Sequence, residues 1–509
     1  MKRILLILMS VVLVLPMLFT GSALAQEGGD DITLAIGTDP ENIDPVEATS
    51  SPAAMVMEHI YDTLFHYSED GEIVPHLAKD YEVSDDGTTW HLHLREDVEF
   101  HDGTKFDAEA VKFNLQRLED ATYGFLISEI TDIEVVDDYT VKLETDEPFA
   151  PLLSHLSHTF ISMVSPKAVE EYGDDYNNNP VGTGPFEFKN WVRGEALTVV
   201  KNEDYWGEEP KPDKVSFMIV PEDSTRVVLL ETGEADAVMR VPPQDIERVE
   251  DNENTAIANV PSVRTIYIGF HVQKEPLDDV KVRKAINYAV DKEAIVEHIL
   301  EGAGRPSDAP ISPGIFGYDS QDRYEYNPEK AKELLAEAGY EDGLELEFYH
   351  PSGRYNMDET IAEAVQTQLA EVDIDVELIN LEWTTYLEEI GQSVDKAPQD
   401  LYMLGWGCVT GDADYGLYSM FHSSQWRPDG PSRSYYANDK VDELLEEARV
   451  TSDDEEREEL YAEAIEQIWD DAPWLFLHSE SQINGYRTNV KGLVHHPLEY
   501  IDASQATIE

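Results

Sequence analysis

The sequence predicts a mixed α/β fold, and two observations lead to that prediction. Apolar residues recur at helical spacing in several segments, whereas other segments alternate apolar and polar side chains as half-buried strands do. Between residues 344 and 380 the patterns occur in the order strand, helix, strand, which is typical of a βαβ unit with parallel strands. The 509 residues exceed what one hydrophobic core usually spans, so two or three domains are expected.

The individual elements follow from these patterns in chain order. Helices are expected at residues 282–290, 331–338, 359–370 and 441–448, and strands at residues 90–94, 344–348, 374–378 and 401–404. The second helix also has clear boundaries. Asn327 is a good N-cap, Pro328 suits the first helical position, and Gly339 provides a left-handed stop. The run at 401–404 is apolar throughout, which indicates a strand covered on both faces.

The first 25 residues have the pattern of a secretory signal peptide. Lys2 and Arg3 precede an apolar stretch, and small residues lead up to a predicted cleavage after Ala25. A retained membrane anchor is the alternative, but the stretch is short for a spanning helix and Pro16 interrupts it. Cys408 is the only cysteine, so we expect no lipid attachment near the cleavage site and no intramolecular disulfide.

The chain is strongly acidic, with 105 Asp and Glu against 36 Lys and Arg and a formal net charge of −69. The acids are interleaved with aromatic residues, whereas a disordered acidic chain would lack aromatics. The pattern favours a folded protein with an acid-rich surface, adapted to a salty environment that screens the repulsion. Nucleic acid is therefore not expected as a partner.

Two loops that follow predicted strands are candidate ligand-binding segments, because ligands of open α/β sheets bind beyond the carboxyl ends of the strands. The first is HPSGRYN at 350–356, in which Arg354, next to Tyr355, could hold a carboxylate through two parallel hydrogen bonds. The alternative is that Arg354 pairs with one of the many surface carboxylates.

The second candidate loop is GWGCVTGDADY at 405–415. Gly405 and Gly407 would let the backbone approach a ligand, and Trp406 offers a flat apolar wall. Asp412 or Asp414 could meet an ammonium group. Alternatively, the segment is only a turn whose aspartates cap the next helix, with Cys408 a small packing residue.

Other motifs predict no catalysis and no metal site. VGTGPF at 181–186 lacks the lysine of a phosphate-binding loop and is interpreted as a turn into a strand. The histidine pairs 91/93 and 495/496 could bind metal, but surface pairs without metal are more common. The sequence contains no Gly-x-Ser-x-Gly, no His-Glu-x-x-His and no catalytic cysteine context.

Taken together, the motifs resemble those of the family 5 extracellular solute-binding proteins, the dipeptide- and oligopeptide-binding components of ABC importers. The resemblance covers essentially the whole chain after the signal peptide. It is carried by VGTGPF at 181–186, NEDYWG at 202–207, LETGEAD at 230–236 and PLDDVKVRKAINYAVD at 276–291. Segment 405–415 and DAPW at 471–474 are most similar to the glutathione-binding branch.

The resemblance implies a two-lobed periplasmic-binding-protein-like fold (type II, cluster C) with an extra inserted domain. Domain I would comprise residues 27–55, 182–264 and 478–509, domain II residues 56–181, and domain III residues 265–477. It implies a monomer that captures a small peptide-like ligand, without a cofactor, and delivers it to the permease subunits of an importer. Release without a lipid tether places such a protein in the periplasm.

The resemblance also implies particular ligand contacts. In dipeptide binders of this family the ligand carboxylate meets an arginine at the position of Arg354, and the ammonium group meets an aspartate where this chain has Val409. The usual ammonium partner is therefore missing, which leaves Asp412, Asp414 or a ligand such as glutathione as hypotheses. A nickel chelate or an oligosaccharide is the alternative ligand, and a secreted hydrolase is the alternative class.

Overall fold

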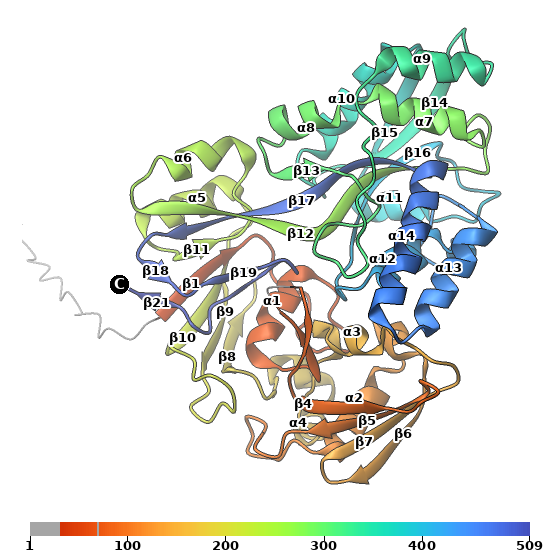
Figure 1. Ribbon diagram of the computed structural model, residues 1–509. Coiled ribbons are helices and arrows are strands. Elements are labelled where there is room, and N and C mark those ends of the chain that lie inside the picture. Colours follow the sequence, from red (N-terminus) through yellow and green to blue (C-terminus); the bar gives the residue numbers. More distant parts are fainter. Residues whose placement is uncertain (1–30, 69–70) are drawn as a thin grey trace, which may run out of the picture.

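The computed structural model describes residues 31–68 and 71–509, so the predicted signal peptide and its cleavage site lie outside the described residues. Within these residues, one eleven-stranded sheet runs through two lobes in the order β15-β14-β16-β12-β17-β11-β1-β10-β9-β8, with β13 paired to β17 (Figure 1). The first lobe contains β1 (Asp31–Ile36), β8 (Phe186–Val192), β9 (Ala196–Lys201), β10 (Lys214–Ile219) and β11 (Ala237–Val238). The second lobe contains β14 (Leu344–Pro351), β15 (Ile374–Leu381) and β16 (Leu401–Gly407).

Two long strands, β12 (Thr255–Phe270) and β17 (Trp474–Arg487), connect the lobes, with the short β13 (Gly304–Pro306) beside β17 (Figure 1). They pair with each other along most of their length, while β12 also pairs with β16 and β17 with β11. Their register shifts between Pro261 and Thr265. An irregularity of this kind disrupts the ladder and bends the strand locally, which makes this segment a candidate hinge between the lobes.

The helices surround this sheet and a smaller one. The first lobe carries α1 (Ser51–Ile60), α5 (Asp223–Thr232) and α6 (Ile246–Glu250). The second lobe carries α7 (Val280–Ala289), α8 (Lys292–His298), α9 (Pro328–Glu337), α10 (Asp358–Ala370), α11 (Trp383–Ile390), α12 (Ala413–Phe421), α13 (Asp439–Val450) and α14 (Asp454–Asp471). A four-stranded sheet of β4 (Ala78–Val83), β5 (Thr89–Leu94), β6 (Ile130–Asp137) and β7 (Thr140–Thr145) packs with α2 (Ala108–Leu118), α3 (Leu152–Leu156) and α4 (Pro166–Tyr172).

Three two-stranded ribbons complete the described structure. They are β2 (Phe65–Tyr67) with β3 (Ile73–Pro75), β18 (Val490–Lys491) with β21 (Thr507–Ile508), and β19 (Val494–His496) with β20 (Tyr500–Asp502). None of the helices in residues 31–68 and 71–509 has the length and apolar character needed to cross a bilayer.

The predicted elements are present at the predicted places. The βαβ unit is confirmed, because β14 and β15 pair in parallel with Leu344 opposite Ile374 and α10 lies between them in the chain. The caps of α9 are confirmed as well: Asn327 accepts a hydrogen bond from the backbone N–H of Lys330 at 3.0 Å, and Gly339 has φ +89°. Strand β16 extends three residues beyond the predicted end at 404.

The VGTGPF segment is a structural turn that leads into β8, as the sequence predicts. Gly182 and Gly184 pack against the end of α1, where a Cβ atom on Gly184 would lie 2.6 Å from the carbonyl carbon of Ile60. Such a distance leaves no room for a side chain, so glycine is required there for packing.

The buried side chains form three hydrophobic cores. One lies under the first-lobe sheet, one within the β4–β7 region, and the largest under the second lobe and the connecting strands. Val56 from α1 and Phe160 pack in the first-lobe core, although both fall within the expected insertion 56–181. The division of the chain into three domains stays a prediction.

Candidate ligand-binding site

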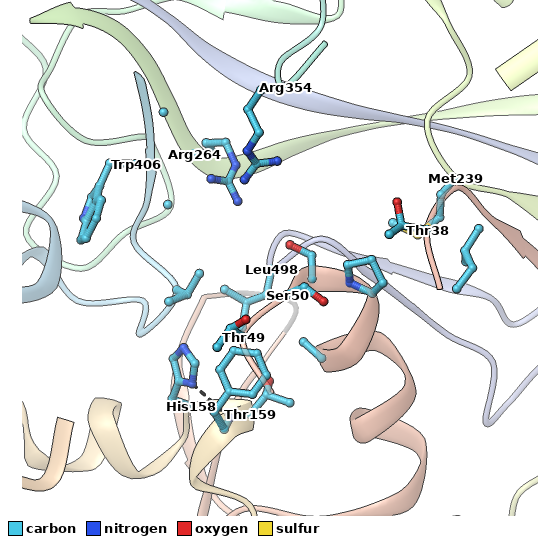
Figure 2. Close-up of a pocket in the computed structure, with 18 of the residues that line it drawn as sticks. Thr38, Thr49, Ser50, His158, Thr159, Met239, Arg264, Arg354, Trp406 and Leu498 are labelled. Atoms are coloured by element: carbon cyan, nitrogen blue, oxygen red, sulfur yellow. Dashed lines mark hydrogen bonds between the residues drawn. The ribbon is translucent and has the colours of Figure 1, made fainter. Parts of the chain in front are cut away.

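A cavity of about 630 Å³ lies between the two lobes (Figure 2). From the first lobe it is lined by residues that follow the parallel strands β1 and β11, including Thr38 and Arg240. From the second lobe it is lined by residues at the ends of the parallel strands β14 and β16, including Arg354 and Trp406. Strand carboxyl ends of both lobes thus face the same space, whose volume suits a small-molecule ligand.

Arg354 lies in the loop between β14 and α10, and the loop is fixed by one carboxylate. Asp358 accepts hydrogen bonds from the backbone N–H groups of Gly353, Arg354 and Tyr355 at 3.2, 2.8 and 3.1 Å. The Arg354 guanidinium lies 5.0 Å from the ring centre of Trp383 and 5.3 Å from that of Tyr355. No carboxylate oxygen in the described part of the chain lies within 4 Å of it. The guanidinium is therefore held over two rings, with its hydrogen-bond donors available to a ligand.

Tyr355 connects the two predicted loops but is not itself a lining residue. Its hydroxyl accepts a hydrogen bond from the backbone N–H of Gly405 at 2.9 Å. A Cβ atom on Gly405 would come within 3.0 Å of the Tyr355 ring and within 2.6 Å of Ile266, so the close approach of the loops requires glycine. Gly405 and Gly407 both line the cavity.

Trp406 forms one side wall of the cavity (Figure 2). Its ring stacks on Tyr415 with centroids 5.2 Å apart and planes inclined by 20°, and its Nε1–H donates to the Tyr415 carbonyl oxygen at 3.2 Å. Tyr415 and Val409 line the cavity beside it. The wall is thus an aromatic pair whose orientation is fixed by contacts within the protein.

Asp412 and Asp414 are not among the residues that line the cavity. Asp412 caps α12 by accepting from the Asp414 N–H at 2.9 Å, and Arg457 donates to both of its carboxylate oxygens at 3.0 and 2.8 Å. Asp414 lies 3.1 Å from Nε of Arg449. Burial raises the pKa of Asp414 to about 6, although Arg449 opposes this. Both carboxylates thus have partners within the protein, which agrees with the interpretation of this segment as a turn and helix cap.

Two cavity arginines were not anticipated from the sequence. Arg264 projects from β12 beside Arg354 (Figure 2), donating to Glu499 at 2.8 and 3.1 Å and lying 3.6 Å from Glu480. Arg240 follows β11 in the first lobe. The only indication in the sequence was the scarcity of basic residues, with 36 Lys and Arg against 105 Asp and Glu.

The remaining lining from the first lobe combines hydroxyl side chains with apolar residues. Thr38 follows β1, and the start of α1 and the segment before it contribute Thr49, Ser50 and Ser51 (Figure 2). His158 also lines the cavity, and its Nδ1 accepts a hydrogen bond from the Phe160 N–H at 3.1 Å. Burial lowers the pKa of His158 to about 3, so its imidazole is neutral at pH 7. This side of the cavity can donate and accept hydrogen bonds without adding charge.

The two histidine pairs lie outside this cavity. His91 and His93 are half-buried on β5. His496 is buried, not at the surface as expected, and its Nε2 lies 3.0 Å from the Tyr67 carbonyl oxygen. Within residues 31–68 and 71–509, no three His, Cys, Asp or Glu side chains form a group that could hold a metal ion.

A two-lobed α/β fold with a cavity between the lobes is the architecture of proteins that close around a ligand, the periplasmic solute-binding proteins among them. The chain belongs to the bacterial extracellular solute-binding proteins, family 5, whose family model matches residues 72–428. This is the family that the sequence motifs indicated.

Individual relatives agree with this assignment. The chain is 33% identical over 468 residues to the glutathione-binding protein GsiB of Salmonella paratyphi A, covering 91% of each chain. Its fold is similar to that of HbpA2 from Haemophilus parasuis, with TM-score 0.85, 26% identity, and coverage of 94% of this chain and 100% of that one. It is also similar to the ABC transporter-associated periplasmic binding protein DppA from Helicobacter pylori in complex with the peptide STSA, with TM-score 0.80, 30% identity, and coverage of 94% and 98%.

Proposed function

We propose that this chain is the exported binding component of an ABC importer and captures a peptide-like solute, glutathione or a short peptide, between its lobes. The observation that carries the proposal is Arg354, a guanidinium that projects into the interlobe cavity from a fixed loop and has no carboxylate of the protein as a partner among the described residues. A peptide supplies the matching carboxylate. The glutathione- and peptide-binding relatives support the same ligand class.

The transport role follows from the architecture. A ligand that contacts both lobes favours the arrangement in which they are close together, and the hinge at residues 261–265 permits that motion. The closed arrangement presents a surface that permease subunits in the membrane can recognise. In this proposal the protein works as a monomer in the periplasm, without a cofactor and without chemical change to the ligand.

Ligand-dependent stabilisation of the exported protein tests the proposal. The protein is purified in about 2 M salt to screen its charge, and unfolding is recorded with glutathione, di- to pentapeptides, nickel with histidine, and oligosaccharides. A ligand at about 100 times its Kd stabilises the folded state by about 2.7 kcal/mol. We expect this shift with glutathione or a peptide and its loss in Arg354→Gln.

Arg323→Gln is the matched control, because Arg323 is an exposed second-lobe arginine outside the cavity. Stabilisation by nickel–histidine or a sugar, with none by any peptide, would overturn the ligand assignment. The mass of the exported protein tests cleavage after Ala25 in the same preparation.

A further inference from the structure

The cavity has the opposite charge character to the rest of the chain. Its lining residues include three arginines, Arg240, Arg264 and Arg354, and no aspartate or glutamate within the described part of the chain. The full sequence has almost three acidic residues for each basic one. A random sample of this composition would line the cavity with acids, so their absence indicates that the cavity accommodates negative charge.

The three arginines differ in whether the guanidinium is available to pair with a ligand. Arg264 is half-buried and engaged by Glu499 and, at longer range, by Glu480, so its charge is balanced within the protein. For Arg240 and Arg354, no carboxylate oxygen of the described residues lies within 4 Å of the guanidinium. These two side chains are exposed and line the cavity. Two cationic groups are thus available in a cavity whose lining includes no carboxylate among the described residues, while Glu480, which does not line the cavity, attracts both arginines from beyond 4 Å.

The two available arginines come from opposite lobes. Arg354 follows β14 in the second lobe, whereas Arg240 follows β11 in the first. The backbone of Arg240 is held in a left-handed conformation, φ +54°. Its N–H donates to Asn484 at 3.3 Å, and its carbonyl oxygen accepts from Arg226 at 3.2 Å. Both arginines therefore project from fixed backbone positions on either side of the cavity.

We infer that the ligand carries two separated carboxylates, one bound by Arg354 of the second lobe and the other by Arg240 of the first lobe. The inference rests on the proposed function and specifies its ligand class: an acidic, peptide-like solute whose amino group needs no ionic partner. Glutathione has two carboxylates at opposite ends and fits this description, whereas a neutral peptide with one terminal carboxylate leaves one arginine without a partner.

A ligand with two carboxylates also explains why the two lobes would close only when the ligand is bound. Without a ligand, bringing the lobes together brings two cations closer, which opposes closure. A dicarboxylate removes that repulsion and adds a charge-assisted hydrogen bond in each lobe, so it favours the closed arrangement through differential contacts.

Calorimetric titration with a matched ligand series tests the inference. The ligands are glutathione, glutathione amidated at its glycine carboxylate, N-acetylglutathione, and the neutral dipeptide Ala-Phe. We expect amidation to weaken binding at least tenfold and N-acetylation to leave it within threefold. We also expect Arg240→Gln and Arg354→Gln each to weaken glutathione binding at least tenfold, and in one of the two variants amidation should have no further effect.

Two further variants separate binding from folding. Arg240→Lys keeps the charge and should retain part of the affinity, whereas Arg248→Gln removes an exposed first-lobe arginine outside the cavity and should bind as the unaltered protein does. If Ala-Phe bound as tightly as glutathione, or if Arg240→Gln left every affinity unchanged, the dicarboxylate inference would fail while the proposed function stood. If no peptide-type ligand bound but nickel–histidine or a sugar did, both would fail.

Discussion

Asp412→Asn is expected to destabilise the protein without weakening ligand binding. Asp412 and Arg457 are 3% and 4% exposed, and their contacts at 2.8 and 3.0 Å form a buried ion pair. Asparagine preserves the N-cap of α12 but leaves the Arg457 guanidinium without its buried carboxylate. Removing one partner of a buried ion pair costs about 3–5 kcal/mol.

The lower end of that range applies here. Asparagine keeps an oxygen that accepts a hydrogen bond from Arg457. Asp454, 3.7 Å from the other amino group of Arg457, adds a small compensation that solvent screens because its side chain is 80% exposed. We therefore expect the free energy of unfolding to fall by about 3 kcal/mol, measured by urea denaturation with tryptophan fluorescence.

Asp453→Asn provides the matched control. Asp453 caps α14 by accepting from the Glu456 N–H at 3.0 Å, but it is exposed and is not the partner of a buried arginine. Because asparagine caps helices as well as aspartate, this variant should lie within about 0.5 kcal/mol of the unaltered protein. If Asp412→Asn instead kept the stability of the control and bound glutathione at least tenfold more weakly, Asp412 would be a ligand contact and the reasoning would be wrong.

Three further predictions concern single residues. Arg354→Gln should raise the Kd of an acidic ligand by about 10- to 100-fold in calorimetry, and Arg354→Lys should recover only part of the loss; full recovery would exclude the two-hydrogen-bond geometry. Burial lowers the pKa of Lys292 to about 7, so the unfolded chain holds the lysine proton to higher pH than the folded one. As the pH increases above 7, the free energy of unfolding of the unaltered protein should therefore increase relative to that of Lys292→Met, by at most about 1.4 kcal/mol per pH unit, as measured by urea unfolding. A difference that does not depend on pH would refute a neutral buried lysine. Gly184→Ala should lower the free energy of unfolding by about 1–3 kcal/mol because its Cβ atom would overlap the end of α1 at Ile60, and unaltered thermal unfolding would contradict that packing.

Local features of the fold were predictable from the sequence, because their causes lie within a few residues. The N-cap at Asn327 and the glycine stop at Gly339 fix α9 through contacts inside one segment. The βαβ unit follows from hydrophobic spacing and the handedness rule alone. The pairing of β12 with β17 could not be derived in this way, since it joins residues more than 200 positions apart and leaves no local pattern.

Only the second-lobe side of the cavity was predictable from the sequence. Arg354 follows β14, and Gly405, Trp406 and Gly407 form the carboxyl end of β16, where general rules for α/β sheets direct attention; all four line the cavity. The partner of Asp412 lies 45 residues away in the chain, so sequence alone could not show that its carboxylate is occupied. Arg240 follows a two-residue strand that is too short for periodicity to reveal.

The acid-free cavity has a consequence for the rate of ligand capture. An acidic ligand approaches a chain with formal net charge −69, although the cavity that receives it is lined by arginines. At about 0.01 M salt the electrostatic screening length is about 30 Å, so the acidic ligand is repelled by the whole molecule. At about 1 M salt the screening length is about 3 Å, so only the arginines in contact with the ligand attract it. The association rate should therefore rise with added salt, the reverse of the slowing that salt imposes on oppositely charged partners. Such a protein would bind its solute fastest at a high salt concentration.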